Sequence, residues 1–356
     1  MSAPLPIRLV TPSLPYLGRA VGRSVAAERP ELRAVDASAG AELRLRQAYV
    51  RHMPRRADLH PRLEGVIADV LDHPGSLVRA RLIHSLGRRR GLDEERALKL
   101  AVGTEYFHTA SLVFDDLPAM DDAETRRGQT CPHLNHGEAA AMLGALAFVN
   151  RGYALLWSCL TDLPLERRLR AAELVEACLG VDGILDGQCR DLHFGDRGQI
   201  GVPDPAVSDP AVTDPAVTDP AEVLAVAEGK TVSLIRLTLL LPAIVTGAEA
   251  RDEVALEELS KAWGLAYQIL DDFKDLLMSG EESGKSARRD DALGRPNYPT
   301  AAGQDKAWRH VDHLLRAARS ELDGLLVRSA DWSPLERVQN LLEEDRERLA
   351  RRRETR

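Results

Sequence analysis

The feature that most constrains this sequence is an apolar run that ends in a row of carboxylates. Residues 108–128 read HTASLVFDDLPAMDDAETRRG, and Asp115 and Asp116 directly follow apolar positions. On a helix these neighbours leave at adjacent angles, and a break at Pro118 lets Asp121 return toward the same face. Carboxylates crowded in this way repel one another unless a cation lies between them, and Mg²⁺ prefers carboxylate and phosphate oxygens. The stretch predicts either a metal site or, as the plainer alternative, a solvated acidic turn.

A second run of the same kind favours the metal site. Asp271, Asp272 and Asp275 lie in ILDDFKD, where positions i and i+4 share one helical face. The preceding turns are apolar, so the acids end a buried helix, where unpaired carboxylates are costly. Two such helices predict a polar, Mg²⁺-binding mouth over a hydrophobic cavity, which suits a ligand with a polyanionic head and an apolar tail.

The composition predicts one large all-α domain. Aromatic residues make up only 4% of the 356 residues, while Ala, Leu, Arg and Glu dominate. The net charge of −8 argues against a nucleic-acid partner. We expect no transmembrane segment and a cytoplasmic location, because the N-terminus lacks a signal-like apolar stretch and no apolar run approaches about 18 residues. Four widely spaced cysteines are expected to be buried free thiols: Cys131, Cys159, Cys178 and Cys189.

Local composition divides the chain into four parts. Residues 1–40, rich in Pro, Gly and Ser, are expected to form a poorly ordered leader. Helical periodicity covers residues 41–335. Within this domain the DPAV[ST] repeat at 202–221 predicts a loop insertion, because regularly spaced proline disfavours a helix. Residues 336–356 are expected to form a charged, solvated helix end.

The motifs resemble those of the trans-isoprenyl diphosphate synthases (the polyprenyl synthetase family), geranylgeranyl diphosphate synthases in particular, over about residues 60–330. DDLPAMD followed by RRG resembles the first aspartate-rich motif of that family, and GLAYQILDDFKD resembles the second. GQCRDL, EGKT and GKSARRDDALGRPNYP follow in family order. The resemblance implies a single-domain all-α bundle around a central hydrophobic cavity, usually a homodimer. It also implies condensation of an allylic diphosphate with isopentenyl diphosphate, using two or three Mg²⁺ ions.

The resemblance also implies roles for individual residues. The ions that bind and ionise the allylic diphosphate would be held by Asp115, Asp116, Asp121, Asp271, Asp272 and Asp275. The same head group would be contacted by Arg126, Lys230, Gln188 and Lys285, and the positions facing isopentenyl diphosphate are Arg127 and His108. The chemistry agrees, because charge develops on the leaving group and the allylic cation needs a dry, apolar cavity.

One family motif is altered in this chain. The family carries GGKRxRP on an early helix, where its lysine and first arginine grip isopentenyl diphosphate. The counterpart PGSLVRAR has Ser76 and Leu77 at those positions and keeps Arg79 in register. Two lost cations would remove charge-assisted hydrogen bonds of about 1.5–3 kcal/mol each. Arg81 or the run at 88–90 are candidates to compensate. The allylic site is therefore expected to be intact and the acceptor site weakened.

Three functions remain open from the sequence. The first is a prenyltransferase that makes a linear diphosphate, and the small Ala110 and Ser111 before the first cluster point toward a C20 product. The second is a terpene synthase or an irregular coupling enzyme that ionises the allylic diphosphate without isopentenyl diphosphate. The lost cations favour this alternative, whereas Arg127 and His108 argue against it. The third is a non-catalytic partner subunit, which would not need six metal-binding acids.

Overall fold

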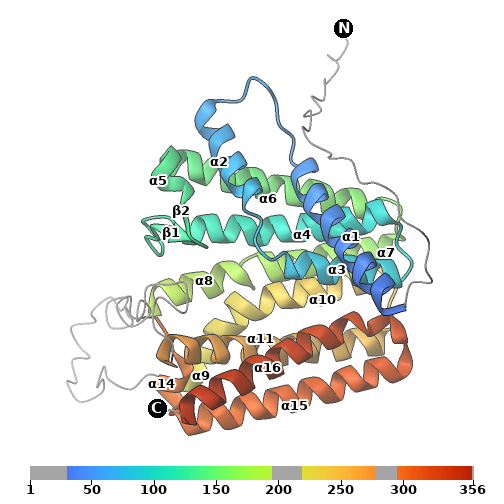
Figure 1. Ribbon diagram of the computed structural model, residues 1–356, viewed down its shortest axis with the longest axis vertical. Helices are drawn as coiled ribbons and strands as arrows, with labels where there is room; N and C mark the ends of the chain where they lie inside the picture. Colours follow the sequence, from blue (N-terminus) through green and yellow to red (C-terminus); the bar gives the residue numbers. More distant parts are fainter. Residues whose placement is uncertain (1–29, 195–218, 278–294, 355–356) are drawn as a thin grey trace, which may run out of the picture.

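The structure is a computed structural model that describes residues 30–194, 219–277 and 295–354. These residues form a bundle of helices with one short hairpin (Figure 1). The elements up to residue 179 are α1 (Pro30–Arg51), α2 (Pro61–Asp72), α3 (Val78–Arg89), α4 (Glu94–Asp115), β1 (Thr125–Arg126), β2 (Gln129–Thr130), α5 (Pro132–His136), α6 (Glu138–Leu160) and α7 (Leu165–Leu179). The later elements are α8 (Ile184–Leu192), α9 (Pro220–Ala227), the π-helical η2 (Glu228–Val232), α10 (Ser233–Thr246), α11 (Ala250–Leu277), α14 (Tyr298–Ala302), α15 (Gln304–Arg328), η3 (Ala330–Trp332) and α16 (Pro334–Glu354).

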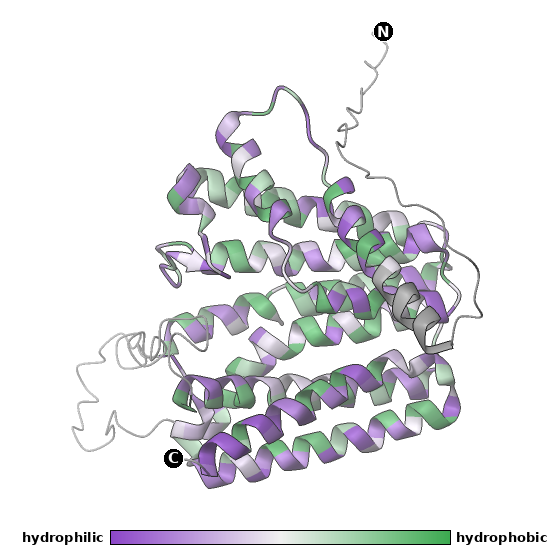
Figure 2. Cartoon of the chain, viewed as in Figure 1, coloured by the Kyte–Doolittle hydropathy of each residue, from purple (hydrophilic) through white to green (hydrophobic). Residues whose placement is uncertain are grey.

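The helices pack in layers around one continuous hydrophobic core, which confirms the all-α prediction. Helix α4 lies along α6 and α3, while α10 connects this layer to α11, and α15 and α16 cover α11. Figure 2 shows hydrophilic and hydrophobic residues alternating along the outer helices α15 and α16. This alternation is expected of helices that bury only one face.

Helix α4 carries the first acidic cluster at its C-terminal end. Its start is defined by Asp93, whose side chain accepts a hydrogen bond of 2.8 Å from the backbone N–H of Arg96. Along its length α4 comes very close to α6, because a Cβ on Gly152 would lie 3.0 Å from the carbonyl oxygen of Gly103. This close packing fixes the direction in which α4 presents Asp115.

Elements from distant parts of the sequence meet at one end of the bundle. In Figure 1 the hairpin β1–β2, the end of α8 and helix α14 all lie on the left side. Helix α4 leads to the hairpin, and α11 ends in the acids of the second cluster. The two acidic clusters are therefore arranged around the same end of the core.

Several boundaries differ from those expected from the sequence. Helix α1 begins at Pro30, well before residue 41. The helical periodicity expected over 41–335 is interrupted at Gly180–Gly183, which separates α7 from α8. Helix α16 runs through the charged helix end expected at 336–356, and it also packs on α11 and α15, where Leu349 is completely buried. Cys189 is exposed, so the expectation of buried thiols is wrong for this cysteine, whereas Cys131, Cys159 and Cys178 are buried. Most of the DPAV[ST] repeat lies outside the described residues.

Helix α6 is an exception to the expectation that no segment is apolar enough to span a membrane. Its length and mean hydropathy of 1.4 over 18 residues pass that test, and 44% of this window is buried. A core helix of a bundle has the same composition, and α6 packs along α4, α2 and α5. Its outer face nevertheless exposes apolar side chains, which Trp157 exemplifies at 67% exposure.

Candidate active site

The loop after α4 folds the first acidic cluster back on itself. The backbone N–H of Asp121 donates to the carbonyl of Asp115 at 2.9 Å, and that of Ala123 donates to the carbonyl of Asp116 at 3.1 Å. Pro118 lies exposed at the tip of this loop. The return of Asp121 toward Asp115 is the geometry that the proline break predicted.

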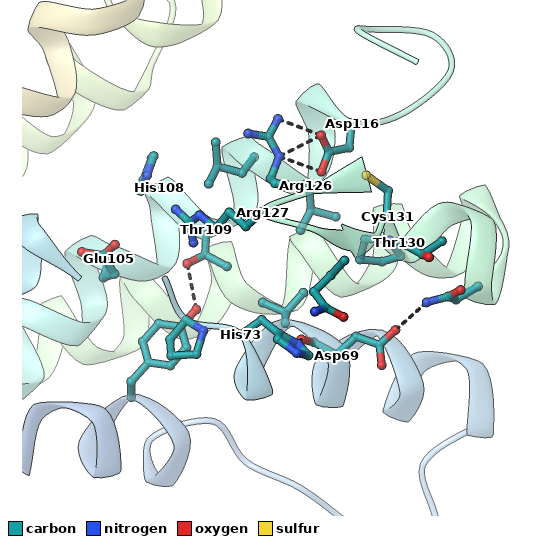
Figure 3. A pocket seen from close by; sticks show the side chains of 18 residues that line it. Asp69, His73, Glu105, His108, Thr109, Asp116, Arg126, Arg127, Thr130 and Cys131 are labelled. Carbon is teal, nitrogen blue, oxygen red and sulfur yellow. Dashed lines mark hydrogen bonds and ion pairs between the residues drawn. The ribbon is translucent and has the colours of Figure 1, made fainter. Parts of the chain in front are cut away.

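A short hairpin brings the first pair of arginines to this cluster. Strands β1 and β2 pair Arg126 with Gln129, and the two residues of the turn, Arg127 and Gly128, have positive φ values of 55° and 77°. Two positive φ angles in succession form the tight turn that suits the twist of a hairpin. Arg126 thereby reaches the buried Asp116, to which its Nε and Nη2 donate at 2.8 Å and 2.7 Å (Figure 3).

The remaining carboxylates of the first cluster favour a bound cation. The pKa of Asp115 is raised to about 6, chiefly by burial. Lys230 opposes this shift, whereas the negative charges of Asp121 and Asp116 contribute to it. A divalent cation would relieve this cost, so the chemistry of the donor set fits Mg²⁺. Within the described ranges, however, no three acidic, histidine or cysteine side chains converge closely enough to hold a metal. The reason is that Asp116 and Asp121 are each drawn to an arginine.

A second set of charged residues, Lys230, Asp191 and Arg295, faces the first acidic cluster across the acid-lined end of the bundle, which we call the mouth. Lys230 donates to Asp191 at 2.6 Å, and Arg295 donates to Asp121 at 2.6 Å while its other nitrogen lies 3.6 Å from Asp191. Burial lowers the pKa of Lys230, but Asp191 and Asp115 outweigh this effect and raise it. The lysine is therefore charged and aimed at the first cluster.

The placement of Lys230 depends on two glycines. It lies in the π-helical turn η2, which packs against α8. A Cβ on Gly187 would lie 2.3 Å from the carbonyl carbon of Gly229, so only glycine allows the two backbones to approach this closely. The same contact brings Gln188 to the site, and its Nε2 is buried without a hydrogen-bond partner among the described residues.

The acids of the second cluster have different surroundings. Asp272 is buried, and its two oxygens accept hydrogen bonds of 2.9 Å from Gln268 and 2.8 Å from the backbone N–H of Tyr298. Asn297 donates to the carbonyl of Asp272 at 3.3 Å. Asp271 and Asp275 are half-buried on the neighbouring face of α11. Asp272 therefore anchors the start of α14, a role that the family resemblance does not imply.

A cavity of about 190 Å³ opens beside the first cluster, between α2, α4 and the hairpin (Figure 3). It reaches from Asp116 and Arg126 to a group of polar residues further along α4 and on the neighbouring elements. That group is formed by Tyr49, His73, Glu105, His108, Arg127 and Asn135. The cavity thus shares Asp116 and Arg126 with the metal-binding end.

Positive charge and unpaired donors characterise this cavity. Burial raises the pKa of Glu105, although Arg79, the backbone N–H of Ala80 and Arg127 lower it. Burial, together with Arg79 and Arg127, lowers the pKa of His108 well below its usual value, so this histidine is neutral. In the described part of the chain, Arg79 Nε and His108 Nδ1 are buried without partners. Buried donors without partners are costly, and an anionic ligand would satisfy them.

The structure brings most of the predicted residues together. Asp115, Asp116, Asp121, Arg126 and Lys230 surround the mouth. Arg127 and His108 line the cavity, and Arg79 lies within electrostatic reach of His108. Lys285 lies outside the described residues. Ser76 is exposed and Leu77 is buried as the left-handed residue before α3, so neither position supplies a cation.

Sequence reasoning missed three charged residues at these sites. Asp191 and Arg295 lie within GQCRDL and GRPNYP, which were quoted as motifs without a role for either residue. Glu105 lies three residues before His108 on α4, where an isolated acid in an apolar helix could have indicated a buried partner for arginine.

The chain is similar in sequence to known prenyl diphosphate synthases. The family model described as Polyprenyl synthetase matches residues 60–322. A chloroplastic geranylfarnesyl diphosphate synthase of Leucosceptrum canum is 29% identical over 234 residues, which cover 66% of this chain and 60% of the relative. A geranylgeranyl diphosphate synthase of Pseudescherichia vulneris is 30% identical over 292 residues, covering 77% of this chain and 85% of the relative.

Solved structures share the fold. A geranyltransferase from Helicobacter pylori, complexed with magnesium and isoprenyl diphosphate, superposes with a TM-score of 0.71 at 22% identity and covers 90% of this chain and 100% of its own. The match to the Leucosceptrum relative spans about three fifths of that protein's length. The similarity is therefore extensive in the bundle that carries both acidic clusters.

Proposed function

Because the chain belongs to the polyprenyl synthetase family, we propose that it is an Mg²⁺-dependent trans-prenyltransferase. It ionises an allylic diphosphate and joins the prenyl group to isopentenyl diphosphate, which gives a linear polyprenyl diphosphate. One observation carries this proposal: a cavity with unpaired buried donors directly adjoins the acid-lined mouth, and the two share Asp116 and Arg126. Two anionic head groups could thus bind side by side.

The residues of the mouth would bind and activate the allylic substrate. Asp115, Asp121 and Asp271 would hold the metal ions, which neutralise the leaving diphosphate as its charge develops. Lys230 and Arg126 add fixed positive charge at the same head group, where preorganised cations act most strongly on the transition state. Apolar side chains of α4 and α11 exclude water from the allylic cation.

The residues of the cavity would hold the acceptor. Arg127 and Arg79 would bind its diphosphate, while the neutral His108 can donate a hydrogen bond without adding charge. We propose a C20 product, since Ala110 and Ser111 are small and lie one turn before Asp115. The names of the relatives differ in prenyl chain length, so this part rests on the two small side chains.

The product mixture tests the proposal. Purified protein with Mg²⁺ is incubated with geranyl or farnesyl diphosphate, with and without isopentenyl diphosphate, and products are identified by mass spectrometry. Longer diphosphates that form only with isopentenyl diphosphate, and that accumulate at C20, support it. Replacing Ser111 with phenylalanine should shift the product toward C15, whereas an unchanged product would contradict the assignment of length.

A terpene synthase or irregular coupling enzyme is the second candidate. The observation that favours it is the absence of a cation at Ser76 and Leu77. Hydrocarbon or alcohol formed without isopentenyl diphosphate would support this alternative. If no allylic diphosphate is turned over, the chain would instead be a non-catalytic partner subunit.

We further propose that the protein is a cytoplasmic homodimer. Leu143, Leu146 and Trp157 form an exposed apolar stripe on α6, and Leu165 and Leu169 of α7 extend it. A second copy of the chain would bury this stripe, which monomers rarely expose. Light scattering after gel filtration should give a molecular mass of twice that of the chain. For the Leu146→Glu variant the measured mass should fall to that of a single chain. Cell fractionation would distinguish this arrangement from insertion of α6 into a membrane.

A further inference from the structure

The loop between α2 and α3 lacks the lysine that the family motif would provide, yet arginines lie on both sides of it. Gly75, which precedes Ser76, has φ of +68°, and a Cβ there would lie 1.8 Å from Nη1 of Arg127. On its other side the carbonyl oxygen of Gly75 accepts a hydrogen bond of 3.3 Å from Nη2 of Arg46. Two guanidinium groups therefore contact the same glycine.

Arg46 lies on α1, and its guanidinium group is half-exposed beside the loop, where it can change partners. Its guanidinium donates to Glu42, one turn earlier, at 3.2 Å, and 42% of the side chain is exposed. Tyr49, three residues later, lines the cavity and shares a hydrogen bond of 2.8 Å with Thr109 of α4. Residues three apart lie on one helical face, so the face that carries Arg46 leads into the cavity.

The charges around the loop favour an anion. Arg79, Arg81 and Arg127 all lower the pKa of the buried Glu105, which places all three within electrostatic reach of that carboxyl group. With Arg46 they make four arginines, against the carboxyl groups of Glu42, Glu105 and the cavity-lining Asp69. Positive charge thus exceeds negative charge beside this loop, even without a lysine at position 76.

Two of the other candidate cations, Arg88 and Arg90, contact groups away from this loop. Arg88 lies 3.0 Å from Glu94, and Arg90 stacks over Trp332 with 4.2 Å between the guanidinium carbon and the ring centroid. Arg81 lies 3.3 Å from Glu42 and so helps to hold the carboxylate that also binds Arg46. Arg46 shares Glu42 with Arg81, but Arg46 also contacts the altered loop itself, through the carbonyl oxygen of Gly75.

We propose that Arg46 replaces the missing lysine and binds the diphosphate of the acceptor together with Arg79 and Arg127. On binding, its guanidinium exchanges the neutral carbonyl of Gly75 for an anionic oxygen, which forms a stronger, charge-assisted hydrogen bond. The residue lies on α1, before the region at 60–322 that matches the family model, so the motif alone would not identify it. This inference rests on the proposed use of isopentenyl diphosphate.

Steady-state kinetics of Arg46→Gln tests this inference. The KM for isopentenyl diphosphate should rise about 10- to 100-fold, as expected for one lost charge-assisted hydrogen bond, while kcat and the KM for the allylic diphosphate stay within about twofold. Arg44→Gln is the matched control, because Arg44 lies on the same helix and pairs with Glu94 at 3.1 Å. Its KM for isopentenyl diphosphate should not change.

A second substitution separates loss of binding from loss of folding. Ser76→Lys, made in the Arg46→Gln protein, should restore most of the affinity, because it returns a cation to the same loop. Calorimetric titration of isopentenyl diphosphate, in the absence of allylic substrate, should show the same order of affinities. An unchanged KM in Arg46→Gln, or no rescue by Ser76→Lys, would overturn the inference while leaving elongation by the wild type intact. Failure of the wild type to elongate any allylic diphosphate would instead refute the proposed function, and this inference with it.

Discussion

The two candidate diphosphate sites solve the same electrostatic problem in opposite ways. At the mouth the side chains of Asp116, Asp121 and Asp191 are already paired with Arg126, Arg295 and Lys230, and acids remain in excess. In the cavity the arginines are in excess, and buried donors of the described residues lack partners. A dianionic head group therefore needs added metal ions at the first site, whereas the second site can bind it with side chains alone.

The largest effect is expected from a substitution at the mouth, the site that needs metal ions. Asp115→Asn removes a buried carboxylate that favours a cation, so kcat should fall about 10³-fold, as when one preorganised electrostatic group is removed. The rate of product formation from geranyl diphosphate measures this. Asp122→Asn is the control, since Asp122 is exposed in the same loop, and a comparable loss in both variants would contradict a metal-binding role for Asp115.

A glycine substitution should disturb the cavity and spare the mouth. Gly75→Ala places a methyl group on Arg127, so the KM for isopentenyl diphosphate should rise about 30-fold through loss of its charged contact. Positive φ by itself costs alanine about 1–2 kcal/mol. Gly303→Ala also places a methyl group at a positive φ, of +85°, but with no described atom within 4 Å of it. A raised KM in both variants would mean that general destabilisation, and not Arg127, is responsible.

We expect Asp271 and Asp272, the two adjacent acids of the second cluster, to have different roles. Asp272→Asn replaces an acceptor that faces the N–H of Tyr298, so the free energy of unfolding should fall by about 1–3 kcal/mol. Asp271→Asn should weaken Mg²⁺ binding more and stability less. Denaturant unfolding and calorimetric Mg²⁺ titration measure the two quantities. Equal loss of Mg²⁺ affinity in both variants would return Asp272 to the set of metal ligands.

The smallest effect concerns the pH dependence of the metal-free protein. The pKa of Asp115 is raised to about 6 in the folded state, whereas an unfolded aspartate titrates near 3.9. Its stabilising contribution is thus fully present below about pH 4 and is lost as pH rises through about 6. Above that pH, Asp115→Asn should melt roughly 2–4 °C higher than wild type without Mg²⁺. Added Mg²⁺ should reverse this order, and a variant that melts lower at every pH would contradict the expected repulsion.

The helical bundle and the two acidic clusters could be predicted from local patterns. Apolar positions at helical spacing identify buried helices wherever the partner helix lies, and Asp93 defines the start of α4 through a bond to its own first turn. The resemblance to the polyprenyl synthetase family, which the comparison confirms, rests on short motifs in a fixed order. The packing of the charged end at 336–356 was not foreseen, because buried Leu349 and Leu342 are few among many charged neighbours.

Which charged side chains meet depends on the packing of the helices. The residue types at the mouth could be read from the sequence, since Asp115, Asp121 and Lys230 belong to recognisable motifs. The sequence could not assign Arg295 to Asp121, 174 positions away, or bring Arg46 to Gly75. Such contacts depend on how helices from distant segments pack against one another, and neither periodicity nor spacing records this. The acidic stretch at the end of α4 therefore indicated the chemistry from the sequence, whereas its counter-charges and the proposed acceptor site follow from the fold.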